Sequence, residues 1–369
     1  MYTYLMVLVT SVAYLGCTTH TETSQSSVTR NEAMAVSVEP AKEWIVKKLG
    51  NHESLSTIQF IDQTHGWVVS RAGQIHLTAD GGETWQHRRV DIPPKAEVSA
   101  SFFIDSLSGW ISVVRMSSDV LQPNETKAWL MKTEDGGNTW LTQYSREALQ
   151  LGRVFFVSSQ EGWAVGSRSI KRETLQDDPV VLHTTNAGTL WEVVSETLPK
   201  GGGGLEFAYH DHSLGLVVLN SEGHLFAASN NGKQWREVAV VPEEPSQTFF
   251  RRAGNLADKR LWVLGGSSGL EGTYGVLAFK GPDNSWTKLN TRAYLSDVMF
   301  LTSDKIIACG FVHETSGKQG VILRSTDGGR TWITDISDYS NVAFTALTRA
   351  GNHLWVIGEE GYIAMLEDF

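Results

Sequence analysis

Residues 78–85 read TADGGETW, and four close copies of this phrase follow later in the chain. The copies are TEDGGNTW at 133–140, TTNAGTLW at 184–191, ASNNGKQW at 228–235 and STDGGRTW at 325–332. Self-similarity at such intervals indicates a repeat protein. Residues that recur in every repeat are expected to maintain the fold rather than to carry out a specific function.

The phrase combines a tight turn with the start of a strand. Asp or Asn at its third position can accept hydrogen bonds from backbone N–H groups further along, and Gly at its fifth position adopts a positive φ without a Cβ clash. The closing Trp begins the next strand and can bury roughly 150–250 Å² of ring surface. We therefore predict that the residues of these boxes are structural.

A longer unit surrounds each box and predicts four short strands. In the first copy, residues 58–60, 66–69 and 74–77 have strand patterns, and a fourth strand starts at Trp85. Four antiparallel strands per repeat are typical of a propeller blade. The Trp residues that end the five boxes, and Trp286 of a degenerate box at 279–286, are spaced by 44 to 55 residues, which indicates six blades.

A seventh blade is predicted to be divided between the two ends of the chain. Residues 354–363 align without a gap on residues 66–75, but the chain stops where a fourth strand should begin. Residues 43–49 carry Trp44 and can supply that strand. The predicted fold is therefore all-β: a seven-bladed β-propeller of four-stranded antiparallel blades, closed by an N-terminal strand in the last blade.

The N-terminal sequence predicts export and a lipid anchor. Residues 1–16 form a short apolar run, and YLGC at 14–17 resembles a bacterial lipobox. We predict a signal peptide over residues 1–17 with lipidation at Cys17, a flexible tether over 18–42 rich in Ser, Thr and Glu, and the propeller over 43–369. The expected location is the bacterial cell envelope, as a periplasmic or surface lipoprotein. An ordinary cleaved signal or a membrane-anchored N-terminus is the alternative.

Composition argues against several classes of function. The formal net charge is −10, whereas nucleic-acid binding favours a basic face. No His and Cys residues have metal-ligand spacing, and the four-glycine run at 201–204 lacks the Lys of a phosphate loop. We therefore expect a monomer without metal or cofactor. Besides Cys17 the chain has only Cys309, which we expect in the core.

The loops between second and third strands are one candidate binding region. In a propeller these loops share a face with the blade connections, which we call the long-loop face because four of the loops are extended. The loop at residues 167–179 contains Arg168, Lys171 and Arg172, together with acidic residues. These basic side chains are predicted to bind a partner; the alternative is that they are only solvated.

The mouth of the central channel is the second candidate region. Aligning the inner strands on Phe60, Phe103, Phe156, Tyr209 and Phe300 puts three charged residues at equivalent positions near that mouth: Arg153, Glu206 and Asp297. Because their blades are neighbours, Arg153 and Glu206 could instead form an ion pair with each other. Arg251 and Arg252, near the fifth inner strand, could add positive charge, but the register of that strand is left open.

The boxes resemble the Asp-box, or bacterial neuraminidase, repeats of sialidases, other glycoside hydrolases, sortilin-type receptors and photosystem II stability/assembly factors. The chain as a whole is similar to the assembly-factor family, since residues 60–85 and 103–140 carry the pattern F-x-D-x-x-x-G-W followed by the box. This resemblance implies a membrane-associated scaffold that is not an enzyme and that binds another protein during assembly, in photosynthetic members a photosystem II subunit.

An Asp-box glycoside hydrolase is the alternative. Similarity to sialidases would imply three arginines, a Tyr nucleophile with its Glu, and an Asp acid/base, with the first Arg near the first inner strand. Residues 57–62 contain no Arg, and the Arg-Ile-Pro motif is absent. Other glycosidases need two carboxylates about 5–10 Å apart, and the sequence does not identify such a pair. We therefore expect a protein-binding scaffold rather than an enzyme, and leave carbohydrate open as a ligand.

Overall fold

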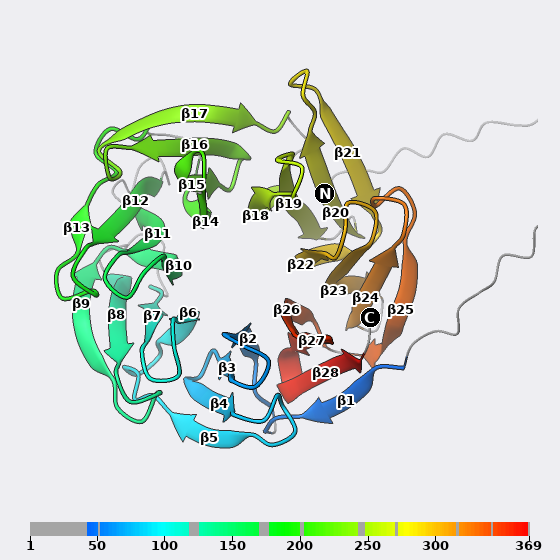
Figure 1. Cartoon of the computed structure of the whole chain (residues 1–369), viewed down its shortest axis with the longest axis horizontal. Helices are drawn as coiled ribbons and strands as arrows, with labels where there is room; N and C mark the ends of the chain where they lie inside the picture. Colours follow the sequence, from blue (N-terminus) through cyan, green and yellow to red (C-terminus); the bar gives the residue numbers. More distant parts are fainter. Residues whose placement is uncertain are drawn as a thin grey trace, which may run out of the picture. The chain divides into compact units, whose positions relative to one another are not determined.

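The computed structural model describes residues 43–50, 52–117, 125–169, 177–199, 203–242, 248–269, 272–314, 317–340 and 342–367. These residues form seven four-stranded antiparallel sheets around a central opening (Figure 1). The predicted seven-bladed β-propeller is confirmed.

Each blade has an inner, a second, a third and an outer strand. The inner strands are β2 (Leu55–Phe60), β6 (Glu97–Phe103), β10 (Gln150–Phe156), β14 (Leu205–Asp211), β18 (Phe249–Asn255), β22 (Tyr294–Phe300) and β26 (Phe344–Ala350). The second strands are β3 (Gly66–Ser70), β7 (Gly109–Arg115), β11 (Gly162–Ser169), β15 (Gly215–Asn220), β19 (Leu261–Gly269), β23 (Ile306–Glu314) and β27 (His353–Gly358).

The third strands are β4 (Gln74–Thr78), β8 (Lys127–Thr133), β12 (Asp177–Thr184), β16 (His224–Ser229), β20 (Gly272–Lys280), β24 (Gly317–Ser325) and β28 (Tyr362–Glu367). The outer strands are β5 (Gln86–Arg89), β9 (Leu141–Glu147), β13 (Glu192–Val193), β17 (Gln234–Val240), β21 (Trp286–Thr291), β25 (Ile333–Ser340) and β1 (Ile45–Lys48). A short 3-10 turn, η2 (Glu359–Gly361), joins β27 to β28. The blades are numbered one to seven in the order of their inner strands.

The first strand of the chain closes the ring. β1 pairs antiparallel with β28, with Ile45 opposite Met365 and Lys48 opposite Tyr362 (Figure 1). Trp44, just before β1, is only 9% exposed and packs into the core of blade seven. The predicted division of this blade between the two chain ends is therefore confirmed.

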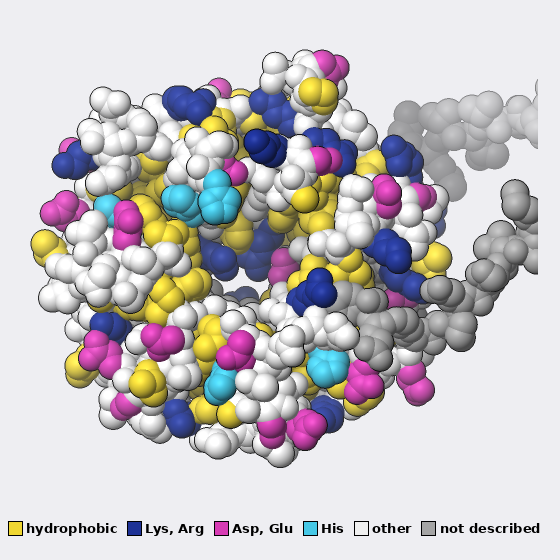
Figure 2. All heavy atoms as spheres, viewed as in Figure 1, with side chains coloured by type: hydrophobic (Ala, Val, Ile, Leu, Met, Phe, Trp, Pro, Cys, Tyr) yellow, Lys and Arg dark blue, Asp and Glu magenta, His cyan; other side chains and the backbone are white. Residues whose placement is uncertain are grey.

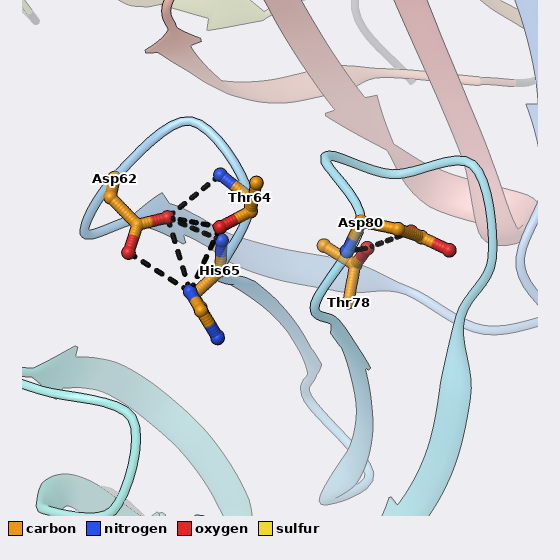
Figure 3. A network of polar contacts seen from close by, with 5 residues as sticks. All are labelled: Asp62, Thr64, His65, Thr78 and Asp80. Carbon is orange, nitrogen blue, oxygen red and sulfur yellow. Dashed lines mark hydrogen bonds and ion pairs between the residues drawn. The ribbon is translucent and has the colours of Figure 1, made fainter.

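Four of the Asp boxes, at 78–85, 133–140, 184–191 and 325–332, are turns held together by their own side chains. Asp80 accepts the Thr84 N–H at 3.0 Å and the Thr84 hydroxyl at 2.5 Å. It also accepts the Thr78 hydroxyl at 2.7 Å (Figure 3). Gly82 has a φ of 92°, and a Cβ at this position would overlap the ring of Trp355 from blade seven. Both the backbone conformation and the neighbouring blade therefore require Gly at this position.

The turn between the first and second strands lies next to the box and follows the same principle. Asp62 accepts the N–H groups of Thr64 at 2.7 Å and His65 at 2.6 Å (Figure 3). The Gly81 N–H then donates to the Thr64 carbonyl at 2.9 Å, which links the box to this turn. The two hairpin ends of a blade thus support each other.

The box carboxylates are expected to make the propeller sensitive to acid. Hydrogen bonds from the Thr139 hydroxyl and N–H lower the pKa of Asp135 to about 2, and Thr331 lowers the pKa of Asp327 to about 2 in the same way. The pKa of Asp80 is also lowered. Because these values lie below the ordinary aspartate value of 3.8, the stabilisation is complete above about pH 4 and is lost as the pH falls toward 2.

The triple variant D80N/D135N/D327N tests this expectation, because asparagine keeps an acceptor oxygen but cannot titrate. Its urea midpoint should fall less steeply between pH 4 and pH 2 than that of the wild type. The chain itself shows that Asn fits a box, since Asn186 accepts the Leu190 N–H at 2.9 Å. Equal slopes for the two proteins would contradict the expectation.

Aromatic rings join neighbouring blades. Trp67 of blade one stacks on Phe103 of blade two, with ring centroids 4.3 Å apart, and the box residue Trp140 meets the same Phe103 edge-on at 6.2 Å. Equivalent pairs between blades are Trp110–Phe156, Trp163–His210, Trp262–Phe300 and Trp355–Phe60. Five of the seven seams thus contain a ring pair, which buries large apolar surfaces between rigid sheets.

The remaining cysteine belongs to the core, as predicted. Cys309 lies in β23, is fully buried, and has a free thiol whose pKa is raised by burial. Within the described residues, no helix has the length and apolarity needed to cross a bilayer. In the same part of the chain, no three His, Cys, Asp or Glu side chains gather as metal ligands.

Candidate functional site

Every inner strand contains a β-bulge, and the residue after the bulge occupies an equivalent position in each blade. In blade one the bulge lies between Leu55 and Thr57, and the Thr57 hydroxyl contacts that of Ser101 in blade two at 2.5 Å. The equivalent residues are Thr57, Ala100, Arg153, Phe207, Arg252, Asp297 and Ala346. The charged members of this set therefore lie together in blades three to six, close to where the inner strands begin.

Two arginines share one aromatic ring in this region. The Cζ of Arg153 lies 4.8 Å from the ring centroid of Phe207, and that of Arg252 lies 5.2 Å from it. Guanidinium groups are attracted to aromatic faces, most strongly where water is excluded, and Phe207 is buried. We call these three residues the arginine cluster. Lys and Arg side chains are visible deep in the central opening (Figure 2).

Asp297 pairs with one of these arginines. Its Oδ1 lies 3.4 Å from Nε of Arg252, and the carboxylate also accepts the N–H groups of Val298 and Leu347, each at 3.0 Å. Leu347 belongs to blade seven, so Asp297 connects blades five, six and seven. Its carboxylate balances the charge of Arg252 and leaves that of Arg153 in excess.

Arg153 is held without a carboxylate partner. Its Nε is buried and has no hydrogen-bond partner among the residues that the structure describes. Burial, followed by the charge of Arg252, lowers the pKa of Arg153 to about 10, so the guanidinium stays charged at neutral pH. A buried donor without a partner is uncommon in proteins, and a ligand acceptor could satisfy it.

The register of blade four differs from the sequence prediction. Tyr209 lies opposite Val217 on β15, as Gln59 lies opposite Trp67 on β3. The counterpart of Phe60 is therefore His210 and not Tyr209. The cause is local: β15 is one residue longer than β3, and the turn before it is shorter, which shifts the alignment by one position.

This shift changes the role of Glu206. Glu206 is the residue inside the bulge, and Phe207 takes the position that the sequence assigned to Glu206. The alternative ion pair with Arg153 is not formed, since Arg153 packs on Phe207 instead. Glu206 is exposed and lines a cavity of about 360 Å³, which also includes the Arg71–Glu97 ion pair at 3.2 Å. Its carboxylate therefore lies beside the arginine cluster and outside it.

Of the three loop candidates, only Arg168 belongs to the described residues, and it lines a different cavity from the one beside Glu206. Arg168 lies opposite Asp178 in blade three and lines a cavity of about 170 Å³ with Arg146 and Glu196, which shares no residue with the cavity beside Glu206. Lys171, Arg172 and Cys17 lie outside the described residues, as do the predicted signal peptide and tether.

Sequence reasoning missed Phe207 and left Arg252 without a position. The feature that places Arg252 is the β-bulge. Every inner strand has its bulge at the same position, so Arg252, Arg153 and Asp297 are equivalent residues of their strands. Bulges depend on pairing with the second strand, which a single sequence shows only indirectly.

Known proteins are similar to this chain over most of its length. The family model described as photosynthesis system II assembly factor YCF48 matches residues 36–113. The photosystem II assembly lipoprotein Ycf48 of Synechococcus sp. (strain CC9902) is 25% identical over 363 residues, which cover 97% of this chain and 94% of that protein. The chain resembles the photosystem II assembly factors. The chloroplastic photosystem II stability/assembly factor HCF136 of Oryza sativa subsp. japonica is also 25% identical, over 82% of this chain and 76% of its own.

Solved structures show the same fold. YCF48 bound to D1 peptide has a TM-score of 0.62 at 19% identity, covering 88% of this chain and 96% of that chain. An ulvan lyase of polysaccharide lyase family PL25 has a TM-score of 0.60 at 10% identity, covering 87% and 96%. The propeller fold therefore occurs in both kinds of protein, and the fold alone does not identify the function of this chain.

Proposed function

We propose that this protein is an exported, membrane-anchored propeller that binds a protein partner and acts as an assembly scaffold. The observation that carries this proposal is its similarity, over 97% of the chain, to a protein named as a photosystem II assembly lipoprotein. The rigid ring, whose two ends are joined in one blade, suits a protein that presents a fixed surface to a partner.

The arginine cluster is the proposed centre of the partner site. Arg153 has a charge without a carboxylate partner and a buried donor without a hydrogen bond, on a protein whose net charge is −10. A carboxylate from a partner peptide would supply both a countercharge and an acceptor. The solved structure of YCF48 bound to D1 peptide supports a peptide as the ligand class.

The membrane anchor is proposed at Cys17. Several similar proteins are named assembly lipoproteins, and the lipobox-like sequence at 14–17 is the residue-level counterpart in this chain. Lipid chains on Cys17 and a tether over residues 18–42 would hold the propeller at the surface of a membrane in the cell envelope, as a periplasmic or surface-exposed monomer.

Peptide binding tests the proposed function. A labelled D1 peptide should bind the wild type, and Arg153→Gln should raise its Kd about tenfold, which corresponds to about 1.4 kcal/mol for the loss of one charge-assisted hydrogen bond. Fluorescence anisotropy measures this directly. Arg89→Gln on the exposed outer strand β5 is the matched control and should leave Kd unchanged.

Two outcomes would contradict the proposal. The first is a wild-type protein that does not bind the peptide. The second is an R153Q variant that keeps both its melting temperature and its affinity.

The glycoside hydrolase alternative gains no specific support from the site. Asp297 is engaged by Arg252 and by two backbone N–H groups, while Glu206 lies on a bulge two blades away. We therefore propose no second function at the channel.

A further inference from the structure

The seam between blades four and five, like the seam between blades six and seven, lacks the ring pair that the other five seams contain. Val217, opposite Tyr209, stands where blade one has Trp67, and it packs toward blade five. Asn255 stands where blade one has Phe60, and its amide donates a hydrogen bond to the carboxylate of Asp211 across the seam. Two small side chains thus replace two large rings, and the Asn255–Asp211 hydrogen bond is a polar contact at one end of an otherwise apolar interface.

A large cleft opens at this seam. Its volume is about 1050 Å³, and its walls are the turn between β14 and β15, strand β17, the turn between β18 and β19, and the turn between β20 and β21. These turns lie on the face that carries the Asp boxes, opposite the long-loop face. His side chains lie over β14 and β15 on this face (Figure 2). The volume is at the upper end of that of ordinary ligand sites.

Basic side chains predominate in the cleft. Arg236, Lys259, Arg260 and Lys280 line it, against the two carboxylates of Asp211 and Asp258. Both carboxylates are already engaged. Asp258 pairs with Arg260 at 2.7 Å, and Asp211 accepts the N–H groups of Ser213 and Leu214, each at 2.8 Å.

Two of these cations are unbalanced. Arg236 and Lys259 are exposed, and neither forms an ion pair with any other residue that the structure describes. In a protein with a net charge of −10, a concave site with excess positive charge concentrates anionic ligands.

The wall of the cleft also contains an unused hydrogen-bond donor. The hydroxyl of Tyr209 is buried and has no hydrogen-bond partner within the described part of the chain. Burial, and then the charge of Asp211, raise the pKa of Tyr209, so the phenol remains protonated and able to donate. Buried polar groups are usually satisfied, so this hydroxyl points to a site that a ligand completes.

We propose that this cleft binds an extended acidic peptide segment of a second protein, whose carboxylates meet Arg236 and Lys259. Val238, Leu256 and Leu261 add aliphatic surface to the lining, which includes the rings of Tyr209, His210 and His212 but no Trp or Phe. The chemistry therefore favours a peptide over an acidic oligosaccharide. Because the cleft lies on the face opposite the arginine cluster, the propeller would hold two protein segments at once, one on each face.

A labelled hexaglutamate peptide is the probe. It should bind the full-length protein at low ionic strength and weaken as salt is added, whereas hexaglutamine should not bind. The double variant R236Q/K259N should raise the Kd for hexaglutamate at least tenfold. Lys259 has a φ of 67°, a conformation that Asn tolerates, so the variant keeps the turn.

The matched control is R89Q/K95N. It also removes two exposed basic residues, one of them at a φ of 60°, but from blade one and the segment that follows it. This control should change the Kd for hexaglutamate less than twofold, because overall charge falls equally in the two variants.

Three results would overturn the proposal: no binding of hexaglutamate to the wild type, equal binding by R236Q/K259N and the wild type, or binding of hexagalacturonate without binding of hexaglutamate. The last result would assign the cleft to an acidic polysaccharide. The channel mouth is tested with a different peptide and a different variant, so failure here leaves the D1 peptide result untouched.

Discussion

A chain that begins at Asn51, and so lacks β1, is expected to lose its cooperative thermal unfolding transition, whereas a chain that begins at Glu43 is expected to keep it. The shorter chain loses four residue pairs with β28, the buried Trp44 and the buried Leu49. Loss of one buried Trp alone costs about 3–5 kcal/mol, a large part of the 5–15 kcal/mol that holds a typical domain together. It also exposes the edge of β28, which favours aggregation.

Calorimetry and light scattering of the two truncated chains measure this effect. Addition of a peptide comprising residues 43–50 should partly restore the transition of the shorter chain, because the missing strand can pair in trans. Equal melting temperatures for the two chains would show that β1 does not close the ring.

Trp355→Ala is expected to be the most destabilising single substitution between blades. Trp355 is 1% exposed, stacks on Phe60 with ring centroids 5.7 Å apart, and meets the box residue Trp85 edge-on at 6.0 Å. Removing it should lower the free energy of unfolding by about 3–5 kcal/mol. The cavity would lie at the seam between blades seven and one, next to the strand that closes the ring.

Urea unfolding of Trp355→Ala and of Trp286→Ala separates this effect from the general loss of a Trp. Trp286 belongs to the degenerate box and is only half-buried, so its removal should cost about 1 kcal/mol. If the free energy of unfolding falls by the same amount in the two variants, ring stacking between blades does not stabilise the propeller as proposed.

The architecture could be predicted from the sequence because its determinants are local. A box needs Asp or Asn, Gly and Trp within eight residues, and each of these has a mechanical role that does not depend on distant contacts. Even the divided blade could be identified, since residues 354–363 match residues 66–75 position by position. The pairing of β1 with β28 follows from this match.

The candidate site was harder to predict because it depends on register across blades. The extra residue in β15 moves Phe207 into the position expected for Glu206. A single sequence does not show at which residue of the strand pair the alignment shifts. Arg252 could not be assigned for the same reason, although its bulge is identical in form to that of Arg153.

The cleft between blades four and five could not be predicted, because it lies where the aromatic ring pair of other seams is absent. Val217 and Asn255 are unremarkable as single residues in strand patterns. Only their placement across one seam, where five other seams have ring pairs, shows that a volume has been left open. The missing ring pair is recognised only when the equivalent residues of neighbouring blades are compared in the three-dimensional structure.

Some of the bulges give the propeller positions at which specificity can change while the scaffold stays the same. At others the bulge residue is structural, since the hydroxyls of Ser99 and Thr345 donate to backbone carbonyls of the next blade. The residue inside each bulge is skipped by the pairing ladder: Ser56, Ser99, Gly152, Glu206, Arg251, Ser296 and Thr345. At Gly152 a Cβ would meet nothing nearer than the Glu206 carbonyl at 3.9 Å, so larger side chains fit. Substitution of exposed bulge residues can therefore change which partner proteins the propeller binds, in evolution or by protein engineering.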